Sequence, residues 1–408
     1  MKKNIIIISS GNRNYREFLL EEISKHYNIY LVCNAEITWE VDYIKEYILV
    51  DRYTIEEVLD AINGALSKPT LQGVLTWDER YLLLTARVAS ELDLPNAGFD
   101  AVQASKDKHL GRNILAEKGL PQPKSIKCHC LDDVVSAANK MSFPVVLKPN
   151  SMGASMGVVK INSIQELFHH FELSKAQCTP GEINDDCALL VEEYIDGEEI
   201  SVDGYVKDGK YKPLYVARKF KGGEPFFLEV KHVVDANDEL LNSEGLIDSL
   251  KKAHQVLGFE NVMTHSELKI NDGSHVVVEI NARLGGGNIP LIAKEAMGIQ
   301  AGLVAAQVAC GDIVDETTSR QKKSATIQFL YPRRKSKIFS IKLPNVMNAQ
   351  VKYKLLSDVG SIVDVPPYDY FGRIAYCIAV DSDRVSSERL ANEYMEKVEV
   401  DLVDFIED

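Results

Sequence analysis

Three features that mark other classes of protein are absent from this sequence: a long apolar segment, a regular cysteine framework and a surplus of positive charge. The isoleucine run at residues 5–8 is too short for the apolar core of a signal peptide, and no stretch is long enough to span a bilayer. The seven cysteines are an odd and scattered set, which favours a reducing compartment such as the cytoplasm. The net charge of −14 disfavours non-specific binding to nucleic acid or to an anionic membrane.

The sequence also lacks two common nucleotide-binding signatures. No G-x-G-x-x-G is present, so Gly11 after the first apolar run is interpreted as part of a tight turn. The small-residue stretch at 151–157 has no G-K-[ST] at its end and is therefore not a P-loop. A nucleotide site in this chain must be built from other groups.

The length of 408 residues predicts more than one packed unit. Residues 1–103 alternate short apolar runs with helical patterns, which is typical of a parallel α/β layer. Residues 104–119 are expected to form one helical stretch closed by Gly119, and the prolines within 121–123 then break the chain. Residues 310–408 form a third region that is rich in short strands and has one terminal helix.

A β-hairpin is predicted over residues 264–281, with turn chemistry at 271–273. A three-residue loop would pair Leu268 with Val276 and keep apolar and polar side chains on opposite faces, whereas a two-residue loop would mix them. The polar side chains that then converge on one surface are Glu267, Glu279 and Asn281. These oxygen ligands suit Mg²⁺ beside phosphate, although a solvated sheet face has the same pattern.

Candidate nucleotide-binding groups precede the hairpin. Lys148 ends a predicted strand, where its ammonium would act as a point charge for phosphate. The small residues of 151–157 would let backbone amides approach phosphate oxygens, or would form a plain hairpin loop. Lys108, near the start of a helix, has by itself the character of a surface lysine. Within 191–201 a strand edge could read adenine and a carboxylate could accept from ribose, although a charged hairpin explains the same pattern.

The order of these motifs resembles that of the ATP-grasp superfamily. Lys108, Lys148 and the glycine–serine loop are followed by EEYIDGEE, HSELKI and VEINARLGG. The resemblance is closest to the L-amino acid ligases, the dipeptide-forming carboxylate–amine ligases of the bacilysin-synthetase type. It covers most of the chain and is strongest over residues 104–300. Each motif is loose, but the ordered set is specific.

The resemblance implies an ATP-grasp fold of mixed α/β and α+β class. Its N-terminal parallel α/β domain would cover residues 1–103. The two-lobed ATP-grasp domain would cover 104–309, with a lid subdomain at about 121–195. A C-terminal α+β lobe over 310–408 would pack on that core.

The resemblance also implies ligand contacts, residue by residue. The ATP-binding set would be Lys108, Lys148, Ser151, Gly153, Ser155, Met156, Gly157, Glu192, Glu193, Tyr194, Ile195, Glu199 and Lys219. The adenine would lie by Glu192 to Ile195 and the ribose by Glu199. The ligands of two Mg²⁺ ions, or of Mn²⁺ as a substitute, would be Glu267, Glu279 and Asn281. The catalytic groups would be Lys148 and Arg283. The substrate contacts would be Glu229, His232, Arg283 and Gly287.

One position departs from the pattern of relatives with narrow substrate pockets, in which the residue after A-R-x-x-G can be aromatic. This chain has Gly287 there, and the missing side chain predicts room for a larger amino acid. The alternative interpretation is a loop glycine that needs a positive φ. His232 likewise has an alternative interpretation as a plain loop histidine.

The implied reaction joins an amino acid carboxylate to an amine, expected to belong to a second amino acid, through an acyl phosphate with release of ADP and phosphate. Small-molecule amino acids would be the partners, a homodimer is one option for assembly, and the location would be cytoplasmic. A carrier-protein acceptor, a purine-type or carboxylase-type substrate, a kinase that stops at phosphotransfer and a non-enzymatic nucleotide binder are the alternatives left open.

Overall fold

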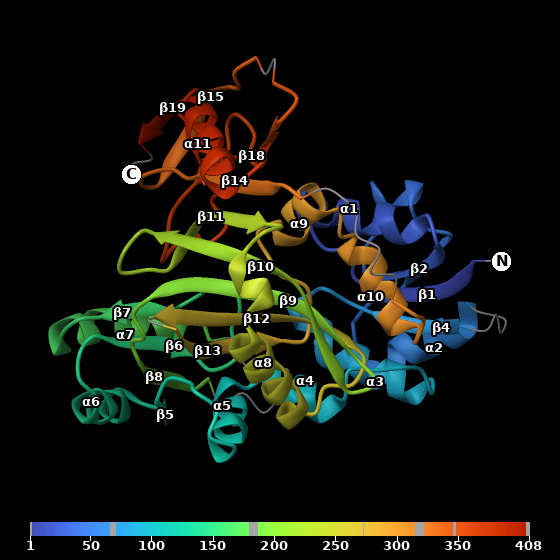
Figure 1. The fold of residues 1–408 in the computed structure, drawn as a ribbon, viewed down its shortest axis with the longest axis horizontal. Helices are drawn as coiled ribbons and strands as arrows, with labels where there is room; N and C mark the ends of the chain where they lie inside the picture. Colours follow the sequence, from blue (N-terminus) through green and yellow to red (C-terminus); the bar gives the residue numbers. More distant parts are fainter. Residues whose placement is uncertain are drawn as a thin grey trace.

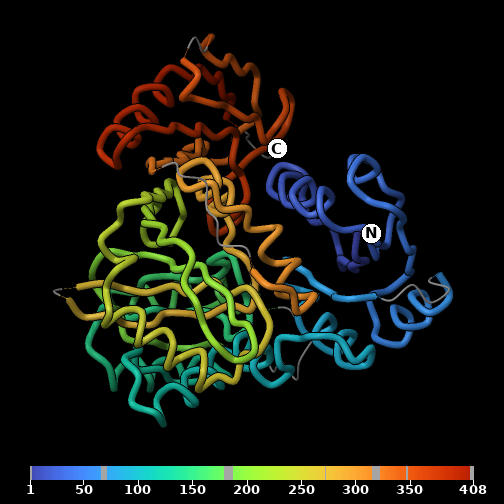
Figure 2. Tube along the Cα trace, turned by 45° about the vertical axis from the view of Figure 1, so that its right-hand side comes forward, coloured from blue at the N-terminus to red at the C-terminus, as the bar shows by residue number. Residues whose placement is uncertain are grey.

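The computed structural model describes residues 2–65, 71–178, 187–271, 273–314, 322–345 and 348–404. The chain forms an N-terminal α/β domain, a four-stranded subdomain and a large central sheet that continues into the C-terminal region (Figure 1). The N-terminal domain, in blue, lies against the orange segment that follows the central hairpin (Figure 2). Parts that are distant in sequence therefore meet around one central region.

The N-terminal domain has the parallel sheet that the sequence predicts. Its strands lie in the order β3-β2-β1-β4, and every neighbouring pair is parallel. The elements of this domain are β1 (Lys3–Ile8), α1 (Arg13–Ser24), β2 (Tyr27–Cys33), η1 (Glu40–Asp42), β3 (Glu46–Leu49), α2 (Ile55–Ala65), β4 (Leu71–Leu75), η2 (Glu79–Tyr81) and α3 (Leu82–Glu91).

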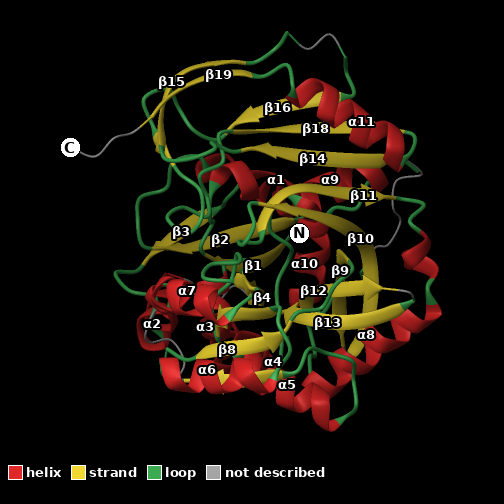
Figure 3. Ribbon diagram, turned by 90° about the vertical axis from the view of Figure 1, so that its left-hand side faces the viewer, coloured by secondary structure: helices red, strands yellow, loops and turns green. Residues whose placement is uncertain are grey.

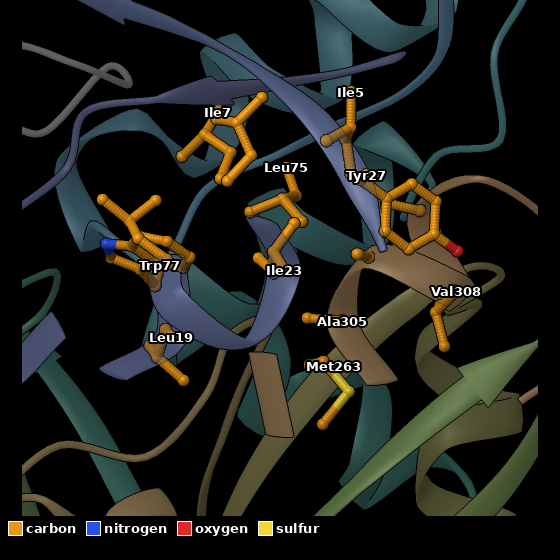
Figure 4. Packing of buried hydrophobic residues seen from close by; sticks show 14 of the residues in the cluster. Ile5, Ile7, Leu19, Ile23, Tyr27, Leu75, Trp77, Met263, Ala305 and Val308 are labelled. Carbon is orange, nitrogen blue, oxygen red and sulfur yellow. The ribbon is translucent and has the colours of Figure 1, made fainter. Parts of the chain in front are cut away.

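The isoleucine run explains why β1 is central in that sheet. Ile5 and Ile7 are buried on the side of α1 and of the later helix α10 (Ala301–Ala309), as Figure 4 shows. Ile6 and Ile8 are buried on the other side, against α2 and α3. Because both faces are covered, the strand is apolar at every position rather than at every second one.

The single helix expected over 104–119 is wrong. α4 (Phe99–Lys106) ends at Asp107, which has an extended conformation. The Asp107 side chain accepts a backbone N–H bond at 2.9 Å and caps a new helix, α5 (Lys108–Glu117). An aspartate competes with the helix for backbone donors, and here it ends one helix and begins the next. Gly119, with φ of +66°, follows the end of α5 as expected.

A separate four-stranded sheet forms the subdomain that contains the small-residue loop. Its strand order is β5-β8-β6-β7 and all pairs are antiparallel. Its elements are β5 (Ser125–Cys128), α6 (Leu131–Lys140), β6 (Val145–Pro149), β7 (Val159–Ile161), α7 (Ile164–Ala176) and β8 (Leu189–Glu193). The loop 151–157 connects β6 to β7, as the sequence predicts.

The central sheet has the strand order β13-β12-β9-β10-β11-β14-β18-β16. Its first five strands come from the middle of the chain, and β14 pairs with β11 to continue the same sheet. A boundary near residue 310 therefore does not coincide with a sheet boundary (Figure 3). The remaining elements are β9 (Glu198–Lys207), β10 (Lys210–Gly222), β11 (Leu228–Asp235), η3 (Glu239–Asn242), α8 (Glu244–Leu257), β12 (Val262–Asn271), β13 (Ser274–Asn281), α9 (Ile289–Met297), β14 (Ser324–Leu330), β15 (Ser336–Lys342), β16 (Val351–Leu355), β17 (Ile362–Val363), β18 (Ala375–Asp381), α11 (Arg384–Met395) and β19 (Glu399–Asp404).

The β12–β13 hairpin exists, but the three-residue loop and its register are wrong. Asn271 pairs with Ser274, so two residues form the turn, of which residue 272 lies outside the described part of the chain. Leu268 then pairs with Val277, and a β-bulge at Val278 shifts the register. The bulge moves the remaining residues of β13 by one position. The polar side chains of β13 beyond the bulge therefore still share one face with those of β12. The bulge produces this arrangement, not the three-residue loop that was expected.

In the described part of the chain, no helix alone is long and apolar enough to cross a bilayer. α9 and α10 reach that threshold only together, and they meet at a bend of 107°.

Candidate functional site

Lys148 and Glu192 form a buried ion pair inside the four-stranded subdomain. The Lys148 ammonium lies 2.5 Å from Glu192 Oε2, and both side chains are almost fully buried. Arg112 of α5 binds the same carboxylate with two N–H groups, at 2.9 and 3.1 Å. Burial opposes ionisation of Glu192, but Lys148 and Arg112 outweigh it and lower the pKa to about 2. Burial lowers the pKa of Lys148 in turn.

The same arginine ties the subdomain to the central hairpin. Arg112 also donates to the carbonyls of Val277 and Val278, at 3.2 and 2.6 Å. Val278 is the bulged residue, so its carbonyl is released from the regular ladder for this contact. The position of Lys148 is therefore fixed relative to the hairpin through Glu192 and Arg112.

The predicted adenine segment lies where the subdomain meets the central sheet. The Glu192 side chain is occupied by its two cations, so an adenine contact from this residue depends on its backbone. Glu193 ends β8, and Tyr194 and Ile195 lie in the connection to β9. The Lys160 ammonium lies 4.7 Å from the centre of the Tyr194 ring. The adenine role of these residues stays a prediction.

Lys108 is not an isolated surface lysine. As the first residue of α5, it donates to the Met152 carbonyl at 2.7 Å and lies 3.2 Å from the Glu279 carboxylate. The helix break at Asp107 makes this possible, because it directs the start of α5 at both the 151–157 loop and the hairpin. The order of the motifs predicts that Lys108 belongs to the site. The Asp107 cap explains how the Lys108 side chain reaches the 151–157 loop and the hairpin.

The loop 151–157 has the backbone geometry of a tight turn. Ala154, Ser155 and Gly157 all have positive φ values, and the space beside Gly153 faces Glu79 and Arg283. The Gly157 amide donates to the hydroxyl of Tyr370, at 3.0 Å, from the C-terminal region. The loop therefore touches Lys108 through Met152 and lies beside Arg283 at Gly153. Contact of Ser151, Gly153, Ser155, Met156 and Gly157 with phosphate stays a prediction.

The hairpin brings the predicted metal ligands together. Glu267 lies directly opposite Glu279 in the ladder, and Asn281 lies opposite His265. The Asn281 amide is almost buried and has no hydrogen-bond partner among the described residues. His265, 3.2 Å from Glu267, is held by Asp203 at 2.5 Å. Burial opposes its protonation, but Asp203 outweighs burial and raises the pKa of His265 to about 9.

This donor set fits magnesium. Glu267 is ionised: burial opposes this, but Lys219 and His265 hold its pKa well below the usual range. Glu279 and the unpaired Asn281 amide add further hard oxygen donors. In the described ranges no three His, Cys, Asp or Glu side chains gather as a metal cluster, so a metal ion held here would also need the Asn281 amide and oxygens of a bound phosphate.

Lys219 is the buried centre of an ionic network on the adjacent strands. Its ammonium lies 2.8 Å from Glu229, 2.9 Å from Glu267 and 3.4 Å from Glu199. Burial alone would lower the pKa of Lys219, but the three carboxylates raise it well above its usual value. Glu199 also binds Lys221, at 2.7 Å. A ribose contact by Glu199, like a triphosphate contact by Lys219, stays a prediction.

Glu229 and His232 lie side by side on β11, as their spacing of three suggests. His232 Nε2 is 3.3 Å from the Glu229 carboxylate, and the ring is fully buried. Burial lowers the pKa of His232, so the ring is neutral near pH 7. The two residues therefore form one end of the site, next to Lys219.

The wider pocket predicted at Gly287 is not supported by the geometry. A Cβ atom at this position would lie 2.6 Å from His232 Nε2, so the imidazole already fills the space. Gly287 also has φ of +56°, which is the alternative interpretation of this glycine.

Arg283 is anchored by a residue of the N-terminal domain. Its Nε donates to the Glu79 carboxylate and its Nη1 donates to the Leu284 carbonyl at 2.9 Å. Burial opposes the charge of Arg283, but Glu79 outweighs it and raises the pKa of the guanidinium. Sequence reasoning missed Glu79, because only tertiary structure brings η2 to the end of β13.

Arg373 and its aromatic neighbours were also missed. The Arg373 guanidinium stacks 3.8 Å from the centre of the Phe329 ring and donates to the Tyr331 hydroxyl at 2.5 Å. It lies 3.8 Å from the Glu229 carboxylate, and Tyr331 donates to the Glu229 carbonyl at 3.1 Å. A lone arginine before an apolar strand gave no signal of this role. Arg373 and Tyr331 of the C-terminal region therefore hold Glu229 in position.

Comparison with known proteins shows which domain family and which relatives this chain resembles. Residues 141–290 match the ATP-grasp domain family. Alanine–anticapsin ligase of Bacillus subtilis is 25% identical over 272 residues, which cover 62% of this chain and 57% of that protein. The chain spans under two thirds of the length of the curated relatives it matches first, at 57% and 63%.

Solved structures show the same fold. An L-amino acid ligase from Bacillus licheniformis superposes with a TM-score of 0.82 and 22% identity, over 99% of both chains. The biotin carboxylase domain of 2-oxoglutarate carboxylase from Hydrogenobacter thermophilus, solved with MgADP, has a TM-score of 0.72 and 14% identity over 99% of this chain and 92% of that one. The fold that the sequence predicts is thereby confirmed.

Proposed function

Since this chain belongs to the ATP-grasp superfamily, we propose that it is an ATP-dependent ligase that joins the carboxylate of one amino acid to an amine, with release of ADP and phosphate. The observation that carries the proposal is the facing pair Glu267 and Glu279, with Lys108 beside it and Arg283 two residues beyond Asn281. A chain that only bound nucleotide would have no need of this complete set.

The first step is phosphoryl transfer. A carboxylate oxygen of the donor amino acid attacks the γ-phosphorus of ATP, the bond to the β-phosphate oxygen breaks, and ADP leaves. Lys108 and Lys148 balance charge on the phosphates, and the 151–157 loop offers backbone amides. Glu267, Glu279 and Asn281 would hold Mg²⁺, which when bound neutralises the phosphate oxygens and orients them.

The second step is acyl transfer. The free amine of the acceptor attacks the acyl carbon, the bond to the phosphate oxygen breaks, and an amide and inorganic phosphate form. Arg283 is a fixed donor for the negative charge that develops on the acyl oxygen and phosphate. The Glu79 carboxylate holds the Arg283 guanidinium in position. Electrostatic stabilisation of this kind is effective because the surrounding groups are already oriented.

The 151–157 loop would help to exclude water from the site. An acyl phosphate would hydrolyse in an open site, and the loop would cover one side of it. The contacts of the loop with Lys108 and Tyr370, and its position beside Glu79, support this role. The partners proposed for the site are small amino acids. We also propose that the protein acts in the cytoplasm and assembles as a homodimer.

The experiment is a phosphate-release assay on the purified chain with ATP, Mg²⁺ and pairs of the twenty amino acids, followed by mass analysis of the products. The expected result is ADP, phosphate and a dipeptide in equal amounts for at least one pair, and none of these with Glu279→Gln. AMP and pyrophosphate, or phosphotransfer without any need for an amine, would overturn the proposal. Activity only with a protein-bound acceptor would point to carrier loading instead.

A further inference from the structure

The first turn of α1 covers the segment that follows the metal-binding strand. Asn288 donates to the Asn14 carbonyl at 3.5 Å, and Arg373 donates to the Tyr15 hydroxyl at 3.4 Å. Arg16 extends from the same turn to the Gly285 carbonyl, at 3.5 Å. Figures 1 and 3 both show α1 beside α9, the helix that this segment enters. The N-terminal domain therefore contributes side chains to the substrate end of the site.

Arg16 is a cation without a matching anion. In the described part of the chain no carboxylate forms an ion pair with it, and its contact with Gly285 is long for a hydrogen bond. Two carboxylates have charges that act on Arg16, and both are already bound: Asp78 by Arg80 at 2.7 Å and Asp203 by His265 at 2.5 Å. Burial, and then the nearby Arg283, lower the pKa of Arg16 to about 10. A poorly solvated guanidinium beside a second one is costly unless an anion binds between them.

The neighbouring arginine of the same helix shows the contrast. Arg13 is more than half exposed and is paired with Glu17 at 2.8 Å, one turn along α1. The first turn of α1 has no acidic residue that could serve Arg16 in the same way. The Arg16 side chain therefore differs from that of Arg13: its guanidinium is directed toward the segment after β13, where it contacts the Gly285 carbonyl.

The order of groups along that segment decides which anion fits. Asn281 is a predicted metal ligand, Arg283 lies two residues further on, and Gly285, which contacts Arg16, lies two residues beyond that. The donor carboxylate must lie at the metal end, where it is phosphorylated. The carboxylate of an amino acid acceptor is separated from its attacking amine by one carbon atom, so it lies just past the acyl carbon, on the side of Arg16.

We propose that Arg16 binds the free carboxylate of the amine-bearing substrate and so selects amino acids as acceptors. This inference rests on the ligase function proposed above. Arg16 would contribute to acceptor binding and orientation, and it would take no part in forming the acyl phosphate. A charge-assisted, two-pronged contact is the geometry that guanidinium and carboxylate favour.

The test compares two acceptors that differ in the carboxylate. Hydroxylamine has no carboxylate and attacks the acyl carbon directly, giving a hydroxamate as phosphate leaves. In Arg16→Met, the KM for the acceptor amino acid should rise about 10- to 100-fold, as expected for one lost charge-assisted contact. Hydroxamate formation from the same donor should stay within about threefold of the wild type, and Arg13→Met should leave both rates unchanged. Arg16→Lys should recover part of the loss.

The wild-type protein supplies a second test that does not depend on a folded variant. It should use an acceptor amino acid at least about tenfold better than the corresponding carboxamide, which has the same amine and side chain. Equal use of acid and amide, or an equal loss of dipeptide and hydroxamate in a folded Arg16→Met, would overturn the role of Arg16. Absence of hydroxamate from the wild type with all twenty donors would instead refute the proposed function, and the inference with it.

Discussion

Glu192 Oε2 lies 2.5 Å from the ammonium of Lys148, and neither side chain reaches bulk solvent. The pair joins β8 to β6 within the subdomain, and Arg112 extends it to the hairpin that carries the proposed metal ligands. Burial lowers the pKa of this lysine, and the Glu192 carboxylate opposes that change and holds the ammonium in place. The same pair makes Glu192 a structural residue as well as part of the site.

Replacing Glu192 with Gln should destabilise the protein strongly. The change leaves two buried cations with a neutral partner, and breaking a buried pair in this way typically costs about 3–5 kcal/mol. Thermal or urea unfolding would measure the loss. Glu193→Gln is the matched control, because its carboxylate only accepts a weak N–H contact at 3.4 Å and should change stability little. Equal effects of the two variants would contradict the assignment.

The stability of the protein should fall in acid between about pH 4.5 and pH 2. The folded pKa of Glu192 is about 2, below the ordinary value of 4.5, so this carboxylate stabilises the fold above pH 4.5 and ceases to do so as pH falls through 2. Unfolding free energy measured by urea titration across this range should decrease for the wild type. Glu192→Gln should show a flatter dependence of unfolding free energy on pH. Parallel curves for the two proteins would mean that Glu192 does not cause the loss of stability in acid.

Glu279→Gln should abolish turnover by weakening metal binding. The amide keeps the shape but removes one of the two facing charges, and raising the Mg²⁺ concentration by about tenfold should not restore activity. Magnesium titration of phosphate release is the measurement. Glu393→Gln, on the exposed face of α11 and paired only with Lys397, is the control. Near-normal activity at low Mg²⁺ in Glu279→Gln would remove Glu279 from the metal site.

Arg283→Ala should lower kcat by about 100-fold or more while changing the KM for ATP little. Loss of one preorganised donor to a developing charge has this typical size. Steady-state kinetics would separate the two parameters. Glu79→Gln should lower kcat less, because the guanidinium remains but its anchor is weakened. A change confined to KM in Arg283→Ala would mean that the arginine only binds substrate.

Gly287→Ala should destabilise the protein and weaken substrate binding. A non-glycine residue at φ of +56° costs about 1–2 kcal/mol, and its Cβ would meet the His232 ring at 2.6 Å. Gly286→Ala is the control, since nothing lies within 4 Å of that position and its φ is not in the left-handed region. Melting temperature and substrate KM should change for the first variant only. The same result in both would point to general loop strain.

Local sequence patterns predicted the layers of this fold well. Apolar runs and helical spacing were sufficient for the parallel N-terminal sheet, and turn chemistry located the β12–β13 hairpin. They failed at two places where a single residue changes the backbone. Asp107 divides one predicted helix into two, and a two-residue turn with a bulge at Val278 replaces the predicted three-residue loop. Both places are also tied to distant residues, because Asp107 accepts from Asn150 and the Val278 carbonyl accepts from Arg112.

What the sequence by itself determined is the identity and order of the polar residues proposed for the site: Lys108, Lys148, Glu267, Glu279, Asn281 and Arg283. Only the tertiary structure decided their partners, because Glu79, Arg16 and Arg373 come from elements that lie far from the hairpin in sequence. Periodicity fixes which face of a strand a side chain occupies. The pairing of charges across domains depends on how whole elements pack, which a local pattern does not encode.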